Sequence, residues 1–128
     1  MALYNGDSPS IQGVAEAAIS KGDYVKQGTI ATNGQYVTPC TAGARGIGFA
    51  AEDIAAGATG RIIVAGTAQA LAHDSGITGG STILKAAASG RANGATTNKD
   101  VIIAHALSSS AAQDDLIDVL VVHYTLSV

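Results

Sequence analysis

The sequence predicts a mostly β protein, a compact domain of the barrel or sandwich type with little helix. The 16 glycines among 128 residues separate short apolar runs, a spacing typical of β barrels and sandwiches. Hydrophobic residues make up 47% of the chain, which suffices for one core in a domain of this length. Helix formers gather at residues 50–56, but Gly57 and Gly60 follow and limit any helix to one or two turns.

Short apolar runs predict the individual strands in chain order. They are residues 24–27, 35–38, 60–65, 81–85, 101–107 and 116–126. The first run follows a turn at Gly22, and the second follows Asn33-Gly34, the strongest hairpin signal in the chain. Pro39 ends the second run, because proline cannot donate a hydrogen bond to a neighbouring strand.

The final run is the longest, and it is apolar on both faces. Alternation places Leu120, Val122, Tyr124 and Leu126 on one face and Val119, Val121, His123 and Thr125 on the other. A strand of this kind lies at the centre of a sheet or is covered by a neighbouring subunit. We therefore expect a subunit interface on this face or on the strand that contains Ile63. The residues expected there are Ile63, Val119, Val121 and His123.

Two halves of the chain share a pattern of glycine and apolar residues. The matching segments are Ile19-Ser-Lys-Gly-Asp-Tyr-Val25 with Ile77-Thr-Gly-Gly-Ser-Thr-Ile83, and Gly48-Phe49-Ala50 with Ala104-His105-Ala106. Two similar β modules, about residues 11–70 and 71–128, would explain this pattern, and a chance match of small and apolar residues is the alternative. Residues 11–128 are expected to form one β-rich domain, because a solenoid needs three or more units.

Charge is sparse, and this narrows the classes of partner. Charged residues are 13% of the chain, the net charge is −3, and the 7 lysines and arginines form no basic run. Nucleic-acid binding needs clustered lysines and arginines, so we do not expect this protein to bind nucleic acid. No apolar stretch approaches the ~18 residues of a membrane span, and the first residues do not resemble a signal peptide, so we expect synthesis in a cytoplasm and no membrane partner. A surface poor in charge favours contact with other proteins, and a neutral monomer is the alternative.

No motif assembles a catalytic, cofactor-binding or metal site. Gly43, Gly46 and Gly48 have the reverse order of a dinucleotide-binding loop and are better explained by turns. The three histidines, His73, His105 and His123, lack metal-ligand spacing; the last two are expected on strands, where a subunit interface could use them as pH-sensitive contacts. Cys40 is the only cysteine, with no histidine near it in sequence. We therefore expect neither an enzyme nor a cofactor.

Several of these segments together resemble the phage capsid decoration (cement) proteins of the domain-of-unknown-function 2190 type. The segments are Ile19 to Val25, Gly46-Ile-Gly-Phe-Ala50, Ala55-Ala-Gly-Ala-Thr-Gly60 with Arg61 to Gly66, Ile77 to Ser81, and the closing strand from Leu116 to Val122. The resemblance implies a compact β fold, usually trimeric, on the outside of an icosahedral shell. Two positions depart from it: Gly80-Ser81 replaces a Gly-Asp turn, and His105 stands where the first half has Phe49.

The resemblance implies a structural protein that binds the outer surface of a phage head and stabilises the shell by bridging capsid subunits. Its partners would be the major capsid protein and two further copies of itself, and its location the virion. Residues 1–10 are expected to form an arm that orders on binding, with Leu3 and Tyr4 filling pockets of the shell; a tail without a role, or an arm that crosses to a neighbouring subunit, is the alternative. The other functions considered are a different virion or cell-surface adhesion module and, from another class, a small enzyme or a carrier domain modified at Lys85.

Overall fold

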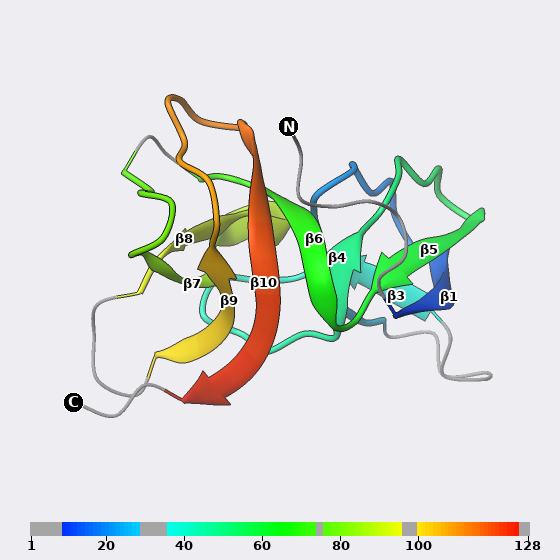
Figure 1. The fold of residues 1–128 in the computed structure, drawn as a ribbon. Coiled ribbons are helices and arrows are strands. Elements are labelled where there is room, and N and C mark those ends of the chain that lie inside the picture. The colour runs from blue at the N-terminus through cyan, green and yellow to red at the C-terminus, as the bar shows by residue number, and fades with distance from the viewer. Residues whose placement is uncertain (1–8, 29–35, 74–75, 96–99, 126–128) are drawn as a thin grey trace.

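The computed structural model describes residues 9–28, 36–73, 76–95 and 100–125, which form two five-stranded units in succession (Figure 1). The first unit contains β1 (Ser10–Ala15), β2 (Tyr24–Gln27), β3 (Tyr36–Pro39), β4 (Gly48–Ala50) and β5 (Thr59–Ile63). The second contains β6 (Gly66–Leu71), β7 (Ile83–Ala86), β8 (Ala92–Gly94), β9 (Val101–Ala106) and β10 (Leu116–Thr125). A single 3-10 turn, η1 (Ala88–Gly90), is the only helical element of the described residues. The predicted mostly β fold is confirmed.

The first unit is a closed barrel with the strand order β1-β3-β2-β4-β5. Only the contact of β1 with β3 is parallel, and it closes the barrel. The interior is filled by Ala15, Ile19, Val25, Val37, Ala50, Ile54 and Ile62. Gly60 allows this packing, since a Cβ there would lie 2.3 Å from Cδ1 of Ile54. Residues 50–56 form no helical turn; Ile54 instead makes an antiparallel bridge to Ile19.

The second unit is a sheet with the order β6-β10-β9-β7-β8. Its strands pair antiparallel, and one parallel bridge from Ala72, just after β6, to Ala92 of β8 brings the two edges together. The long strand β10 lies between β6 and β9, as Figure 1 shows. A position inside the sheet is one of the two that the sequence predicted for a strand with two apolar faces.

The two units repeat one pattern of pairing. The pairs β1–β5, β2–β3, β2–β4 and β4–β5 of the first unit correspond to β6–β10, β7–β8, β7–β9 and β9–β10 of the second. Turn hydrogen bonds correspond as well: Gly22 N–H donates to Ala50 O at 2.9 Å, and Gly80 N–H donates to Ala106 O at 2.8 Å. Both glycines have positive φ, +90° and +86°. A position in one unit can therefore be compared directly with its counterpart in the other.

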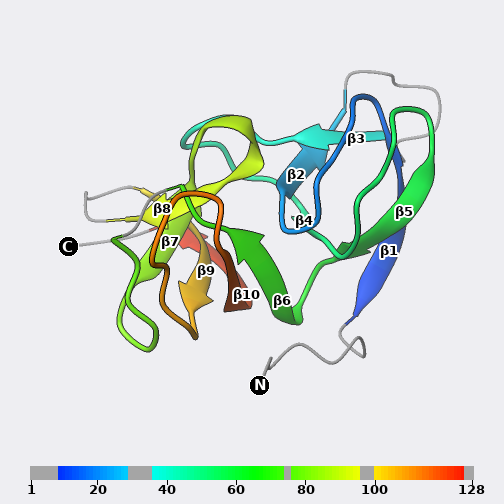
Figure 2. The ribbon, with the colours of Figure 1, turned by 90° about the horizontal axis from the view of Figure 1, so that it is seen from above.

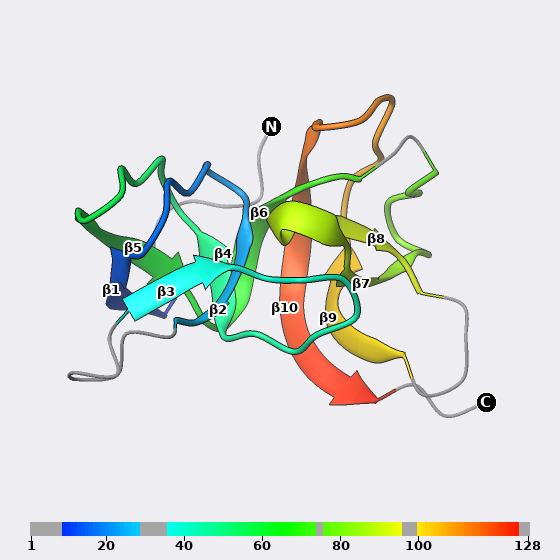
Figure 3. The same ribbon diagram turned by 180° about the vertical axis from the view of Figure 1, so that it is seen from behind.

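A shared core joins the units along β4 and β6, which lie side by side in Figures 2 and 3. Because side chains of a strand alternate, Ile62 points into the barrel while Ile63 points outward onto the second unit. The side chains of Tyr24 and Phe49 also point out of the barrel. They pack in the same hydrophobic cluster as the inner face of the second sheet. The outside of the first unit thus completes the core of the second.

Candidate interaction surface

The residues expected at a subunit interface lie mostly inside the chain's own core. Ile63 is 1% exposed, Val119 0% and Val121 7%, and all three belong to the shared cluster. Their side chains are covered by the same chain and offer no free surface to a partner. Leu3 and Tyr4, expected on the arm, lie outside the described residues.

His123 joins the two units through a hydrogen-bond chain. Gly46 N–H donates to the hydroxyl oxygen of Tyr24 at 2.7 Å, and that oxygen lies 2.7 Å from Nε2 of His123. Since the hydroxyl already accepts one bond, its own proton can be donated to Nε2, which requires a neutral imidazole. Burial, with a smaller contribution from Arg45, lowers the pKa of His123, and burial raises the pKa of Tyr24. Both groups are thus held neutral, and His123 is a link within the chain.

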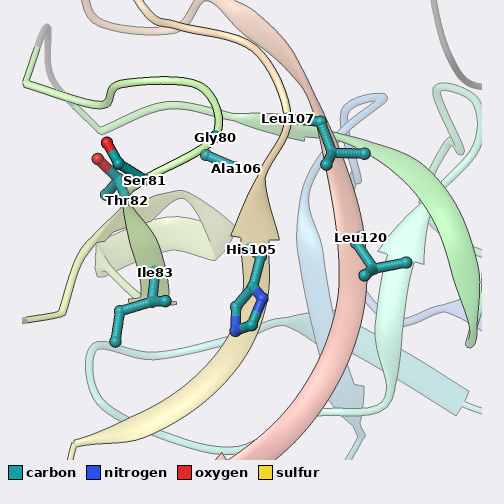
Figure 4. A pocket seen from close by; sticks show the side chains of 8 residues that line it. All are labelled: Gly80, Ser81, Thr82, Ile83, His105, Ala106, Leu107 and Leu120. Carbon is teal, nitrogen blue, oxygen red and sulfur yellow. The ribbon is translucent and has the colours of Figure 1, made fainter.

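The outer face of the second sheet carries two of the exposed large apolar side chains, Leu120 and Tyr124. Ile83 of β7 pairs with His105 of β9, which pairs with Leu120 of β10, so the three form a row across the sheet. Figure 4 shows the three side chains of this row among those that line a depression of the surface. The depression has a volume of about 250 Å³. Its lining is Gly80, Ser81, Thr82, Ile83, His105, Ala106, Leu107 and Leu120. Leu120 is 38% exposed, and the lining holds no carboxylate, lysine or arginine.

Tyr124 fixes the centre of this face. Its hydroxyl lies 2.9 Å from Nε2 of His105, and the two rings meet edge to face with centroids 5.8 Å apart. Tyr124 is itself 38% exposed. A contiguous apolar patch with a few fixed polar groups is typical of a surface that contacts another protein.

The comparison with known families assigns the chain. The family described as phage cement protein matches residues 5–122. The chain belongs to this family. The predicted resemblance is confirmed, and the protein is a phage structural protein associated with the capsid. No curated protein sequence gives a match.

The fold of this cement protein occurs in a second phage head protein. A crystal structure of the N base of head fiber gp8.5 from bacteriophage phi29 matches with a TM-score of 0.74 at 13% identity. The match covers 94% of this chain and 98% of that chain. At this identity the likeness establishes a common fold.

Two neighbouring carboxylates, Glu52 and Asp53, and the thiol of Cys40 have structural surroundings in the cement protein. Glu52 accepts a hydrogen bond from Arg61 N–H, and Asp53 accepts one from Lys21 N–H, so these carboxylates fasten loops. Cys40 is buried, which raises the pKa of its thiol and makes it a poor nucleophile. Within the described ranges, no group of three or more His, Cys, Asp or Glu residues could hold a metal.

Lys85, the residue considered for a carrier domain, lies within β7 and not at a hairpin tip. Its ammonium is 3.6 Å from a carboxylate oxygen of Asp100. A carrier lysine must swing freely between sites, and a strand residue paired with a carboxylate does not offer that freedom. Of the described part of the cement protein, no helix is long and apolar enough to span a membrane.

Proposed function

We propose that this cement protein binds the outer surface of a phage head and stabilises the shell by bridging capsid subunits. The observation that carries the proposal is the family match over residues 5–122. A protein that binds the assembled shell and not its free subunits shifts the equilibrium toward the shell. Many copies on a symmetric lattice add avidity to each weak contact.

The fold supports this role. A bridge must hold two contact surfaces at a fixed separation, and here two β units share one core, which includes Tyr24, Phe49 and Ile63 of the first unit and Val119 of the second. In our proposal the partners are the major capsid protein and two further copies of this chain. The protein is made in the host cytoplasm and acts without catalysis.

The N-terminal arm is the proposed contact with the shell. β1 begins at Ser10, which pairs with Ile63 of β5, so the proposed arm is attached to the barrel. Leu3 and Tyr4 are apolar enough to fill pockets on a capsid protein. Deletion of residues 2–9 should leave the melting temperature unchanged and weaken shell binding at least tenfold; full binding after deletion would remove the arm from the proposal.

The test of the function is reconstitution on heads that lack the protein. Purified protein is added to such heads, bound copies are located by electron microscopy, and the temperature of genome release is measured with and without it. We expect ordered density on the outer surface at positions that touch more than one capsid subunit, and a higher release temperature. Absence of binding, or binding that contacts one subunit and leaves the release temperature unchanged, contradicts the proposal.

A second candidate is the base of a fibre, favoured by the common fold with the phi29 head fiber base. In that case the chain would hold the rest of a fibre on the head. The same reconstruction separates the two, because a fibre base would carry additional density pointing away from the shell.

A further inference from the structure

One row of cross-strand neighbours occurs twice in the chain. In the first unit, Tyr24 of β2 pairs with Phe49 of β4, and Phe49 pairs with Ile63 of β5. The corresponding strands of the second unit are β7, β9 and β10, and their row is the set described above: Ile83, His105 and Leu120. Both rows stand on the outward side of their unit.

The two rows differ in what covers them. Tyr24, Phe49 and Ile63 are at most 1% exposed, because the second unit packs on them. Leu120 is 38% exposed, and Ile83 and His105 are partly exposed. The same face of the module is therefore a packing surface in the first unit and is uncovered in the second.

We propose that the row formed by Ile83, His105 and Leu120 is covered by a second copy of this chain. This proposal deepens the self-association included in the proposed function and identifies its surface. The internal junction shows that this chain already packs its own polypeptide onto this face of a module. In a closed symmetric oligomer every copy uses the same surface for its contact with a neighbour, and a patch without formal charge lets a neighbouring copy approach without like-charge repulsion.

The difference between the rows fits an interface between separate chains. The central position is Phe49 in the permanent junction and His105 in the uncovered row. The imidazole, held by Tyr124, and the hydroxyls of Ser81 and Thr82 give the free face groups that water can solvate. A face that must be exposed before assembly tolerates such groups, whereas a permanent core favours a phenyl ring.

The test is the mass of the free protein in solution, measured by sedimentation equilibrium over a wide concentration range without capsids. Wild-type protein should reach a multiple of 12.6 kDa. Leu120→Asp should weaken self-association at least hundredfold, because a carboxylate would be buried without a partner. The matched control is Ile11→Asp, since Ile11 is 45% exposed but lies on β1 of the other unit; it should associate like wild type.

Circular dichroism melting checks that each variant folds, and Leu120→Gln replaces Leu120→Asp if the latter does not. Wild-type protein that is monomeric at every concentration, or variants at position 120 that associate like wild type, overturns the proposal. Loss of shell binding by Leu120→Asp with its mass unchanged also overturns it and assigns the face to the shell. Shell binding by wild type is scored separately, so failure of the proposed function is distinguishable from failure of this interface.

Discussion

Gly22 and Gly80 offer a matched pair of substitutions that measures the junction between the two units. The two glycines occupy equivalent turns of the two units, and both have positive φ. The N–H of each donates a hydrogen bond to a backbone carbonyl, Gly22 to Ala50 O and Gly80 to Ala106 O. At Gly80, an added Cβ meets nothing within 4 Å. At Gly22, it would lie 2.6 Å from Cδ2 of Leu116 and 3.1 Å from Leu71 N, both in the second unit.

The expected losses follow from these distances. Alanine in the left-handed region costs about 1–2 kcal/mol at either position. Crowding in a packed region adds about 1–3 kcal/mol at Gly22 only. Part of the crowding can be relieved by rotation of Leu116, which is 44% exposed, but the backbone at Leu71 cannot move without disturbing its hydrogen bond to Gly22 O at 3.0 Å. Gly22→Ala should therefore lose about 2–5 kcal/mol and Gly80→Ala about 1–2 kcal/mol.

Urea unfolding followed by far-ultraviolet circular dichroism gives both free energies, since the loss appears as a lower midpoint at constant slope. The reasoning fails if the two variants lose the same free energy, because the second unit would then not press on Gly22. A larger loss for Gly80→Ala would also refute it.

Three further predictions concern polar groups near the junction that are buried or partly buried. Tyr24→Phe should cost about 1–3 kcal/mol in urea unfolding, because the partly buried Gly46 N–H loses its acceptor and His123 its donor; an unchanged midpoint would contradict this chain of bonds. Burial lowers the pKa of His123 from its usual 6.5, so the unfolded state takes up the proton first and the melting temperature should fall as pH drops below about 6.5; His123→Gln should flatten that fall, and equal slopes would disprove the assignment. Burial also raises the pKa of Asp23, so its charged form destabilises the fold, and Asp23→Asn, which keeps an acceptor for Ser20 N–H, should raise the melting temperature at pH 7 by a margin that shrinks toward pH 3. A margin that grows on acidification would reverse that sign.

The strands that the sequence predicted contain β-branched or aromatic residues, but such residues did not suffice, because β1, which contains Ile11 and Val14, was not among the predicted runs. The runs at 24–27 and 116–126 correspond closely to β2 and β10. β6, Gly-Thr-Ala-Gln-Ala-Leu, and the three-residue β8 were not predicted, because their small residues have little intrinsic preference for a strand. These segments are strands because distant parts of the chain pair with them, and a local sequence pattern does not show which distant segments will pair.

The interface residues show a different limit of sequence reasoning. Alternation along β10 separated Val119 from Leu120 correctly, but both faces are apolar, so the pattern did not indicate which one the chain itself covers. The covered face depends on Tyr24, Phe49 and Ile63 arriving from the other unit. The replacement of Phe49 by His105 in the second half was visible in the sequence, and it marks the centre of the uncovered row.

The adjacent pair Ile62 and Ile63 has a consequence for synthesis of the protein. Ile62 completes a barrel whose strands all precede residue 64, so this unit can close as soon as it leaves the ribosome. The side chains of Ile63, Tyr24 and Phe49 then form an exposed apolar surface on the folded barrel before the second unit has been translated. The strands of the second unit can pack on that surface as they are synthesised. The core of the barrel can therefore form first and the shared core second, in the order of translation.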